Sequence, residues 1–183
     1  MNLTDQRLLS PGDSLLVIID MQERLLPVIT GKERVVENVI RLVKFSHIIG
    51  LQAILTEQEK LGNTIPEICR ELGNIEPIPK LEFDCFRSSL FSDKIRSMKR
   101  STLIIAGVEA HICVAQTALH GLAHYTIHVV SDATSSRSLH NWEIALHRMR
   151  QAGAIITSTE MVIYELLGKA GTDTFRESLK LVK

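Results

Sequence analysis

The amino-acid sequence predicts an α/β protein with three layers, in which helices cover both faces of a mostly parallel central sheet of about six strands. Short apolar runs rich in β-branched residues alternate along the chain with longer segments of helical period. This alternation is typical of strand–helix–strand units around a buried parallel sheet. At 183 residues and 45% apolar content, the chain can close one well-buried core, and we expect a single domain over residues 1–183.

Each expected strand is a short apolar run that ends in polar or turn-forming residues. In chain order the runs are 14–20 (SLLVIID), 51–56 (LQAILT), 75–79 (IEPIP), 101–107 (STLIIAG), 125–130 (YTIHVV) and 153–158 (GAIITS). A helical stripe from Val35 to Val43 and another from Ile144 to Met149 lie between runs. Three T-x-x-E sequences predict helix starts with side-chain caps, at Thr30/Glu33, Thr64/Glu67 and Thr157/Glu160.

Charge and cysteine usage narrow the class of function. The 21 basic and 21 acidic residues cancel and are scattered, so we expect neither nucleic acid nor an anionic membrane as partner, and a small neutral or zwitterionic molecule fits better. The N-terminal residues contain no signal-like apolar region, and no apolar run is long enough to span a bilayer. The three cysteines form no CxxC pair, which favours reduced thiols and a cytoplasmic protein.

Polar residues lie at the carboxyl ends of most of the expected strands. In open α/β sheets, ligands bind outside the carboxyl ends of the strands. The closing residues are Asp20, Thr56-Glu57, Lys80, Gly107-Val108-Glu109 shortly before Cys113, and Ser131-Asp132.

Cys113 lies where an apolar strand gives way to a helical pattern. A helix start and a nearby ammonium, such as that of Lys80, lower a thiol pKa, and Asp20 could hold the ammonium and accept the thiol proton. The residues alone leave simpler interpretations open. Cys113 could be a small buried residue, Asp20 a strand-end cap and Lys80 a solvated loop charge.

Several motifs together resemble the isochorismatase-like cysteine hydrolase family. They are LLVIIDMQERLL, PIPKLEFDCF, IIAGVEAHICVAQTALHGL, HVVSDATSSRS and RMRQAGAIITSTE, in the family's order and spacing over about residues 14 to 165. The most specific of them is G-V-E-x-H-x-C followed by V-x-Q-T-A. The resemblance implies the Rossmann-like fold of this family and a homo-oligomer.

The resemblance also implies a site and a reaction. It assigns a catalytic triad of Asp20, Lys80 and Cys113, a cis peptide bond between Val108 and Glu109, and an oxyanion hole formed by the backbone N–H groups of Glu109 and Cys113. The implied reaction is metal-independent cleavage of a small amide, carbamoyl or ureido substrate through a cysteine thioester, with no cofactor. We expect the substrate pocket to be lined by Gln22, Phe83, Phe86 and His111.

The chain also departs from the family pattern. Family members with a metal site carry D-x-H after the second strand, where this chain has Thr56-Glu57-Gln58, so we expect no metal. Asp84 could line the pocket and favour a cationic substrate, or cap the helix starting near Ser88. Cys85 could be a core residue or a resolving partner for Cys113.

Two other functions remain open at this point. One is vinyl-ether hydrolysis of an isochorismate-type substrate, against which Cys113 argues, because the resemblance implies that true isochorismatases work without a cysteine nucleophile. The other is a non-catalytic or thiol-redox protein that keeps the fold and the cysteine.

Overall fold

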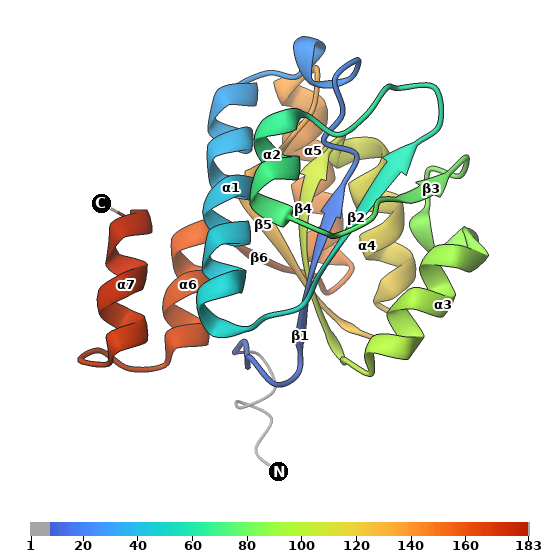
Figure 1. Ribbon diagram of the computed structural model, residues 1–183. Helices are drawn as coiled ribbons and strands as arrows, with labels where there is room; N and C mark the ends of the chain where they lie inside the picture. Colours follow the sequence, from blue (N-terminus) through green and yellow to red (C-terminus); the bar gives the residue numbers. More distant parts are fainter. Residues whose placement is uncertain (1–7, 183) are drawn as a thin grey trace.

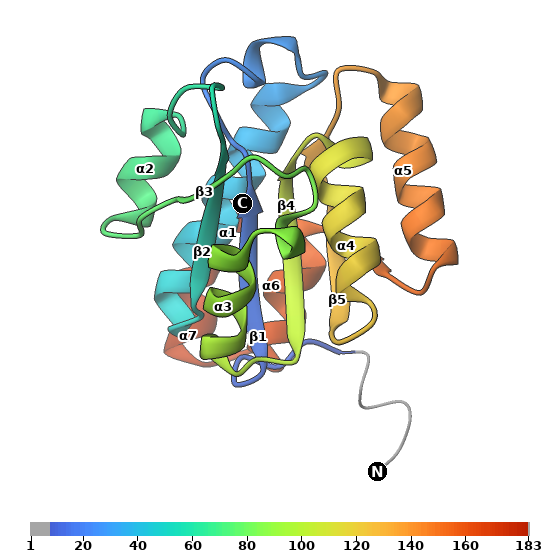
Figure 2. The same ribbon diagram turned by 90° about the vertical axis from the view of Figure 1, so that its right-hand side faces the viewer.

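The computed structural model describes residues 8–182, which form a six-stranded parallel sheet between two layers of helices (Figures 1 and 2). The strands are β1 (Ser14–Ile19), β2 (Ala53–Gln58), β3 (Ile78–Lys80), β4 (Thr102–Val108), β5 (Thr126–Ser135) and β6 (Ile155–Thr157). Their order in the sheet is β3-β2-β1-β4-β5-β6, and every neighbouring pair is parallel. The predicted fold class is confirmed.

Seven α-helices and three short helical turns accompany these strands in the described part. The α-helices are α1 (Lys32–Ile49), α2 (Pro66–Leu72), α3 (Ser89–Met98), α4 (Ala115–Gly121), α5 (Leu139–Gln151), α6 (Thr159–Leu167) and α7 (Asp173–Val182). The short turns are η1 (Leu26–Val28), η2 (Cys85–Arg87) and the π-helical turn η3 (Ala110–Val114). Among residues 8–182, no helix combines the length and apolar character needed to cross a membrane.

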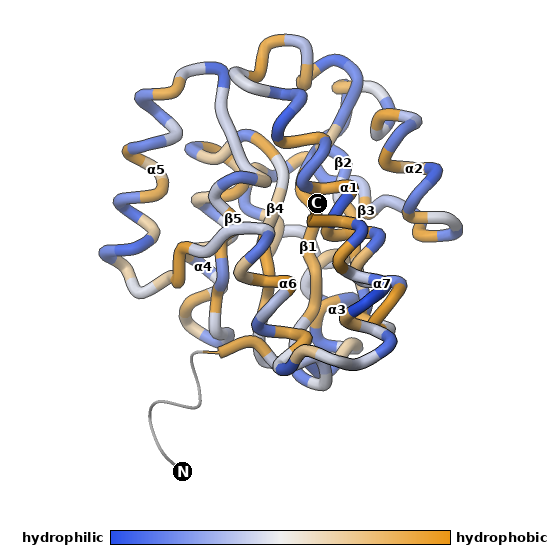
Figure 3. Tube along the Cα trace, turned by 90° about the vertical axis from the view of Figure 1, so that its left-hand side faces the viewer, coloured by the Kyte–Doolittle hydropathy of each residue, from blue (hydrophilic) through white to orange (hydrophobic). Residues whose placement is uncertain are grey.

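The helices divide between the two faces of the sheet, and each face has its own apolar core. Helices α1, α2, α6 and α7 cover one face, and α3, α4 and α5 cover the other (Figure 1). The tube in Figure 3 shows the central strands largely orange and the covering helices alternating between orange and blue. This contrast is expected because strands buried on both faces need continuous apolar sequence, whereas helices bury one stripe.

The structure corrects several predicted boundaries. Strand β5 extends to Ser135, past the predicted end at residue 130, because a shift in register against β4 between Ile105 and Gly107 absorbs extra residues. The predicted threonine caps are wrong. Helix α1 is preceded by Gly31 in the left-handed region, and α2 begins with a proline after Ile65. Helix α6 is capped one residue later than predicted, by the Ser158 hydroxyl.

Gly107 lets β1 and β4 approach closely at the end of the sheet that carries the polar residues. Its φ is +112°, and a Cβ atom there would lie 2.1 Å from the carbonyl oxygen of Ile19. No side chain fits at that distance without moving the backbone. The close approach brings Asp20, the residue after Ile19, to the same sheet edge as Glu109.

Gly107→Ala should therefore lower the free energy of unfolding by more than about 3 kcal/mol, since it combines backbone strain with a collision against β1. Gly153→Ala is the matched control, because Gly153 has a φ of +110° but open space where the Cβ would be. That control should lose only about 1–2 kcal/mol. Urea unfolding of both variants makes the comparison, and equal losses would show that the close approach is unimportant.

His128 is a buried histidine of β5. It is 1% exposed, and within residues 8–182 neither ring nitrogen has a hydrogen-bond partner. Its register neighbours are Ile104 on β4 and Ile155 on β6. Burial lowers the pKa of His128 from 6.5 to about 4, so the folded protein keeps this ring neutral where an unfolded chain would bind a proton.

Stability should consequently fall as the pH drops from 6.5 towards about 4, because the unfolded chain binds more protons in this window. The contribution of His128 to this loss is at most about 3 kcal/mol. His128→Leu should flatten the decline, as measured by urea unfolding at about pH 7.5 and about pH 4.5. If the stability of His128→Leu fell with pH as much as that of the parent, groups other than His128 would cause the fall.

Candidate functional site

The carboxylate of Asp20 is buried at the end of β1 and held on both oxygens. The Thr56 hydroxyl on β2 donates to Oδ1 at 2.8 Å, and Lys80 Nζ donates to Oδ2 at 2.7 Å. Asp20 has a φ of +53°, a left-handed conformation that aspartate tolerates better than most residues. The side chain is 0% exposed, so these two partners stand in for water.

Lys80 is the last residue of β3, and its ammonium group is buried among three acceptors. Nζ lies 2.7 Å from Asp20 Oδ2, 2.8 Å from Gln58 Oε1 and 3.7 Å from Cys113 Sγ. Because an ammonium has three hydrogens, each acceptor can receive one. The polar ends of β1, β2 and β3 thus meet around a single cation.

Electrostatics keep Lys80 charged in spite of its burial. Burial by itself lowers the pKa of Lys80, but the charge of the nearby Asp20 carboxylate and its hydrogen bond with Nζ raise it above its ordinary value. The net direction is upward. Lys80 is therefore a permanent cation at neutral pH, next to the sulfur of Cys113.

Cys113 lies on the π-helical turn η3, between β4 and α4. The residue is 6% exposed. Burial raises the pKa of the Cys113 thiol and the Asp20 carboxylate raises it further, while Lys80 opposes them less strongly. The lowering of this pKa expected from the sequence is wrong, because burial and the carboxylate outweigh the ammonium. The thiol rests protonated beside a carboxylate that can accept its proton.

The turn before Cys113 is fastened to the end of β5. The Val108–Glu109 peptide bond is cis. The buried Glu109 carboxylate accepts the backbone N–H of Arg137 at 2.9 Å and lies 3.3 Å from the Arg137 guanidinium. His111 Nδ1 lies 2.9 Å from the Ser136 hydroxyl. His111 thus contacts the segment that follows β5 through Nδ1.

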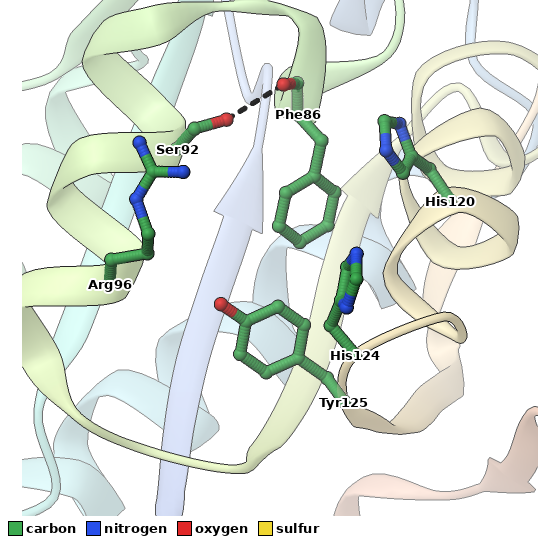
Figure 4. Close-up of a pocket in the computed structure, with 6 residues that line it drawn as sticks. All are labelled: Phe86, Ser92, Arg96, His120, His124 and Tyr125. Atoms are coloured by element: carbon green, nitrogen blue, oxygen red, sulfur yellow. Dashed lines mark hydrogen bonds between the residues drawn. The ribbon is translucent and has the colours of Figure 1, made fainter.

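The other residues predicted to line the pocket, Gln22, Phe83 and Phe86, differ in their burial and in their contacts. Gln22 is 0% exposed, and its amide bonds both backbone polar groups of Gln58 and the carbonyl of Gly62, so it braces a loop. Phe83 is 55% exposed. Phe86 lines a groove between α3 and α4 (Figure 4). The lining of that groove includes none of the residues around Lys80; it consists of Phe86, Ser92, Arg96, His120, His124 and Tyr125.

The structure also places Asp84 and Cys85. The Asp84 carboxylate caps η2, where it accepts the Phe86 N–H at 3.0 Å, and it pairs with His120 Nδ1 at 2.7 Å. It is therefore a cap, although of a turn earlier than the one expected at Ser88. Cys85 is 0% exposed in the apolar cluster that also contains Cys113, and burial raises the pKa of its thiol to about 12.

Thr56 and Gln58 contact the buried ion pair, and sequence reasoning missed this role. In the sequence, Thr56 is one of the polar residues at a strand end, and Gln58 stands out only because Thr56-Glu57-Gln58 replaces a metal-binding D-x-H. Their spacing on β2 held a usable signal, because residues two apart on a strand share a face. Within residues 8–182, no three His, Cys, Asp or Glu side chains come together as ligands for a metal ion.

Comparison with known proteins shows the family of this chain. The isochorismatase domain matches residues 14–161. The chain belongs to the isochorismatase family. Isochorismatase domain-containing protein 2 from Danio rerio is 36% identical and aligns over 95% of this chain and 89% of its own length.

Solved structures also share the fold, and two of them illustrate the similarity to this chain. That of the MAR1 ribonuclease from Caenorhabditis elegans has a TM-score of 0.89 and 33% identity, and covers 95% of this chain and 91% of its own. The YcaC protein from Escherichia coli, described as an octameric hydrolase of unknown specificity, has a TM-score of 0.86 and 24% identity, and covers 96% of this chain and 87% of its own. This chain therefore has the fold of an isochorismatase-family hydrolase.

Lys80→Met should lower the free energy of unfolding by about 3–5 kcal/mol, because it leaves the Asp20 carboxylate buried without a cation. The double variant Asp20→Asn/Lys80→Met should recover more than half of that loss. Arg41→Met serves as the control, since it breaks the exposed Arg41–Glu37 pair and should change stability by less than about 1 kcal/mol. Urea unfolding tests all three, and a loss in Lys80→Met no larger than in the control would contradict the expectation.

Proposed function

We propose that this protein is a metal-independent cysteine hydrolase that cleaves a small amide, carbamoyl or ureido compound, with Cys113 as the nucleophile. The observation that carries the proposal is the buried contact of Lys80 with both Asp20 and Cys113. A carboxylate, a fixed cation and a thiol then meet at the carboxyl ends of three strands, where open α/β sheets bind their ligands.

The proposed reaction begins with proton transfer from the Cys113 thiol to Asp20 as sulfur attacks the carbonyl carbon. The carbonyl electron pair moves onto oxygen, and the backbone N–H groups of Glu109 and Cys113 are the proposed donors to that oxyanion. Lys80 stabilises the negative charge on sulfur. Collapse of the tetrahedral intermediate breaks the C–N bond, and the departing nitrogen takes the proton from Asp20, which leaves a thioester.

Water completes the cycle. It gives a proton to Asp20 and attacks the thioester carbon, and the second tetrahedral intermediate expels the sulfur, which recovers its proton from Asp20. Each half-reaction moves one proton onto the carboxylate and one off it. The raised pKa of the resting thiol is compatible with this scheme, because the thiol needs to lose its proton only during the attack, when Asp20 can accept it.

The proposed substrate class follows from the chemistry of the site and from the charge of the chain. A thiol nucleophile suits acyl transfer, which vinyl-ether hydrolysis does not involve. The charge of the whole chain is balanced, whereas RNA binding depends on cations that neutralise phosphates. We therefore propose a small molecule, although the C. elegans relative is called a ribonuclease.

The oligomeric state and the cellular location of this protein are proposals. The E. coli protein is described as an octamer, and we propose a homo-oligomer for this chain as well. A cytoplasmic location remains a prediction from the sequence. The relative from Phytophthora sojae, 33% identical over 96% of this chain and 87% of its own length, is called a secreted effector.

A screen of small amides, carbamoyl compounds and ureido compounds for ammonia release tests the proposal. Cys113→Ala should lower kcat/KM for the best substrate by at least about a thousandfold, because it removes the nucleophile. Cys69→Ala is the control, since Cys69 lies on α2, away from these groups, and should leave turnover unchanged.

Retained hydrolysis in Cys113→Ala would overturn the proposed mechanism. Turnover of isochorismate by that variant would instead support vinyl-ether chemistry. Mass spectrometry after mild peroxide treatment distinguishes hydrolysis from the thiol-redox function. The redox function requires that Cys113 is oxidised rapidly and that no amide substrate is turned over.

A further inference from the structure

Gln58 is the third group that holds Lys80, and it is itself held at every polar atom. Its side-chain oxygen accepts from Lys80 Nζ at 2.8 Å, and its amide nitrogen donates to the Leu81 carbonyl at 2.7 Å. Its backbone N–H donates to Gln22 Oε1 at 2.8 Å, and its carbonyl accepts from Gln22 Nε2 at 2.9 Å. The Leu81 contact fixes which end of the amide faces Lys80, since only the NH2 group can donate to a carbonyl.

These contacts determine the direction of the ammonium hydrogens. The three N–H bonds of Lys80 are arranged tetrahedrally, so fixing two of them fixes the third. Asp20 receives one and Gln58 receives another. The remaining one points towards Cys113 Sγ, 3.7 Å from the nitrogen. Without an acceptor at position 58, the ammonium could turn away from the sulfur while it kept its bond to Asp20.

The charge balance explains why the acceptor is an amide. Lys80 and Asp20 cancel, and a Cys113 thiolate leaves the cluster with one negative charge. A glutamate at position 58 would accept the same hydrogen but would add a second negative charge beside the sulfur. A neutral amide accepts the bond without competing for the cation.

We propose that Gln58 is a positioning residue that turns the Lys80 ammonium towards Cys113 and keeps the full positive charge available to its thiolate. The inference rests on the proposed role of Cys113 as the nucleophile. Gln22 holds Gln58 in place, because its amide group forms hydrogen bonds with both backbone polar groups of Gln58.

Alkylation by iodoacetamide tests the inference without any substrate. The rate at Cys113 is measured by peptide mass spectrometry between about pH 6 and about pH 9, where it follows the small thiolate fraction. The titratable or charged groups that act on this thiol are Asp20, Lys80 and Cys85. Cys69, which is exposed, is the internal reference for the reagent, and the fully buried Cys85 reports any loosening of the core.

Gln58→Glu should slow alkylation of Cys113 by at least about tenfold at every pH, which corresponds to a rise of one unit in the thiol pKa. Gln58→Met, similar in length but without a strong acceptor, should slow it by about threefold to tenfold. Cys69 should react at an unchanged rate in Gln58→Met, and Cys85 should stay unreactive in both variants.

Rates at Cys113 within about twofold of the parent in both variants would overturn the proposal. So would alkylation of Cys85 together with faster alkylation of Cys113, because that result assigns Gln58 a purely structural role. If Gln58→Glu fails to fold, Gln58→Met decides alone. A failure of the proposed mechanism is detected by a different measurement, namely hydrolysis retained in Cys113→Ala. That result does not depend on the alkylation rates.

Discussion

The buried ion pair between Asp20 and Lys80 is the interaction on which the rest of the site depends. Both side chains are 0% exposed, and removing two such charges from water costs several kcal/mol per ion before any attraction is counted. The structure offsets this with a complete set of partners. Thr56 donates to the anion, and Gln58 accepts from the cation. Loss of either charge leaves the other one stranded.

The sheet topology explains how residues far apart in the chain can supply this pair. Asp20, Lys80 and Cys113 follow or end β1, β3 and β4, and the strand order places β2 between β1 and β3. Parallel strands put all their carboxyl ends at one edge. Strand β2 can therefore offer Thr56 and Gln58 to the two charges on either side of it, and Gly107 allows β4 to close against β1.

The sequence was sufficient to predict the architecture, because buried parallel strands need continuous apolar runs and these runs are visible in the chain. It was insufficient for β5, whose extra residues enter the ladder through a shift in register against β4. The predicted threonine caps were wrong because the backbone conformation at the helix starts does not follow from the T-x-x-E pattern alone. A T-x-x-E sequence indicates that a side chain can cap a helix, but Gly31 and the proline after Ile65 set the actual starts.

The three central residues of the candidate site were predictable from the sequence, but the residues that hold them and the electrostatics of the site were not. Motif order singled out Asp20, Lys80 and Cys113, which the structure brings together. The role of Gln58 was hidden because it depends on the register between β2 and β3. The direction of the Cys113 pKa was predicted wrongly because a helix start and an ammonium were the visible influences, whereas burial acts more strongly and follows only from packing.

The directions of these pKa values bear on the choice between hydrolysis and redox chemistry. Oxidation of a cysteine proceeds through the thiolate, and the pKa of Cys113 is raised, first by burial and then by Asp20. The second thiol in the cluster, Cys85, is fully buried with a pKa of about 12. A redox sensor needs an exposed thiolate, and this pair provides neither exposure nor charge. A hydrolase needs charge on sulfur only during the attack, when Asp20 can accept the proton and Lys80 can face the developing anion. The arrangement therefore favours a nucleophile that the bound substrate activates over one that is reactive at rest.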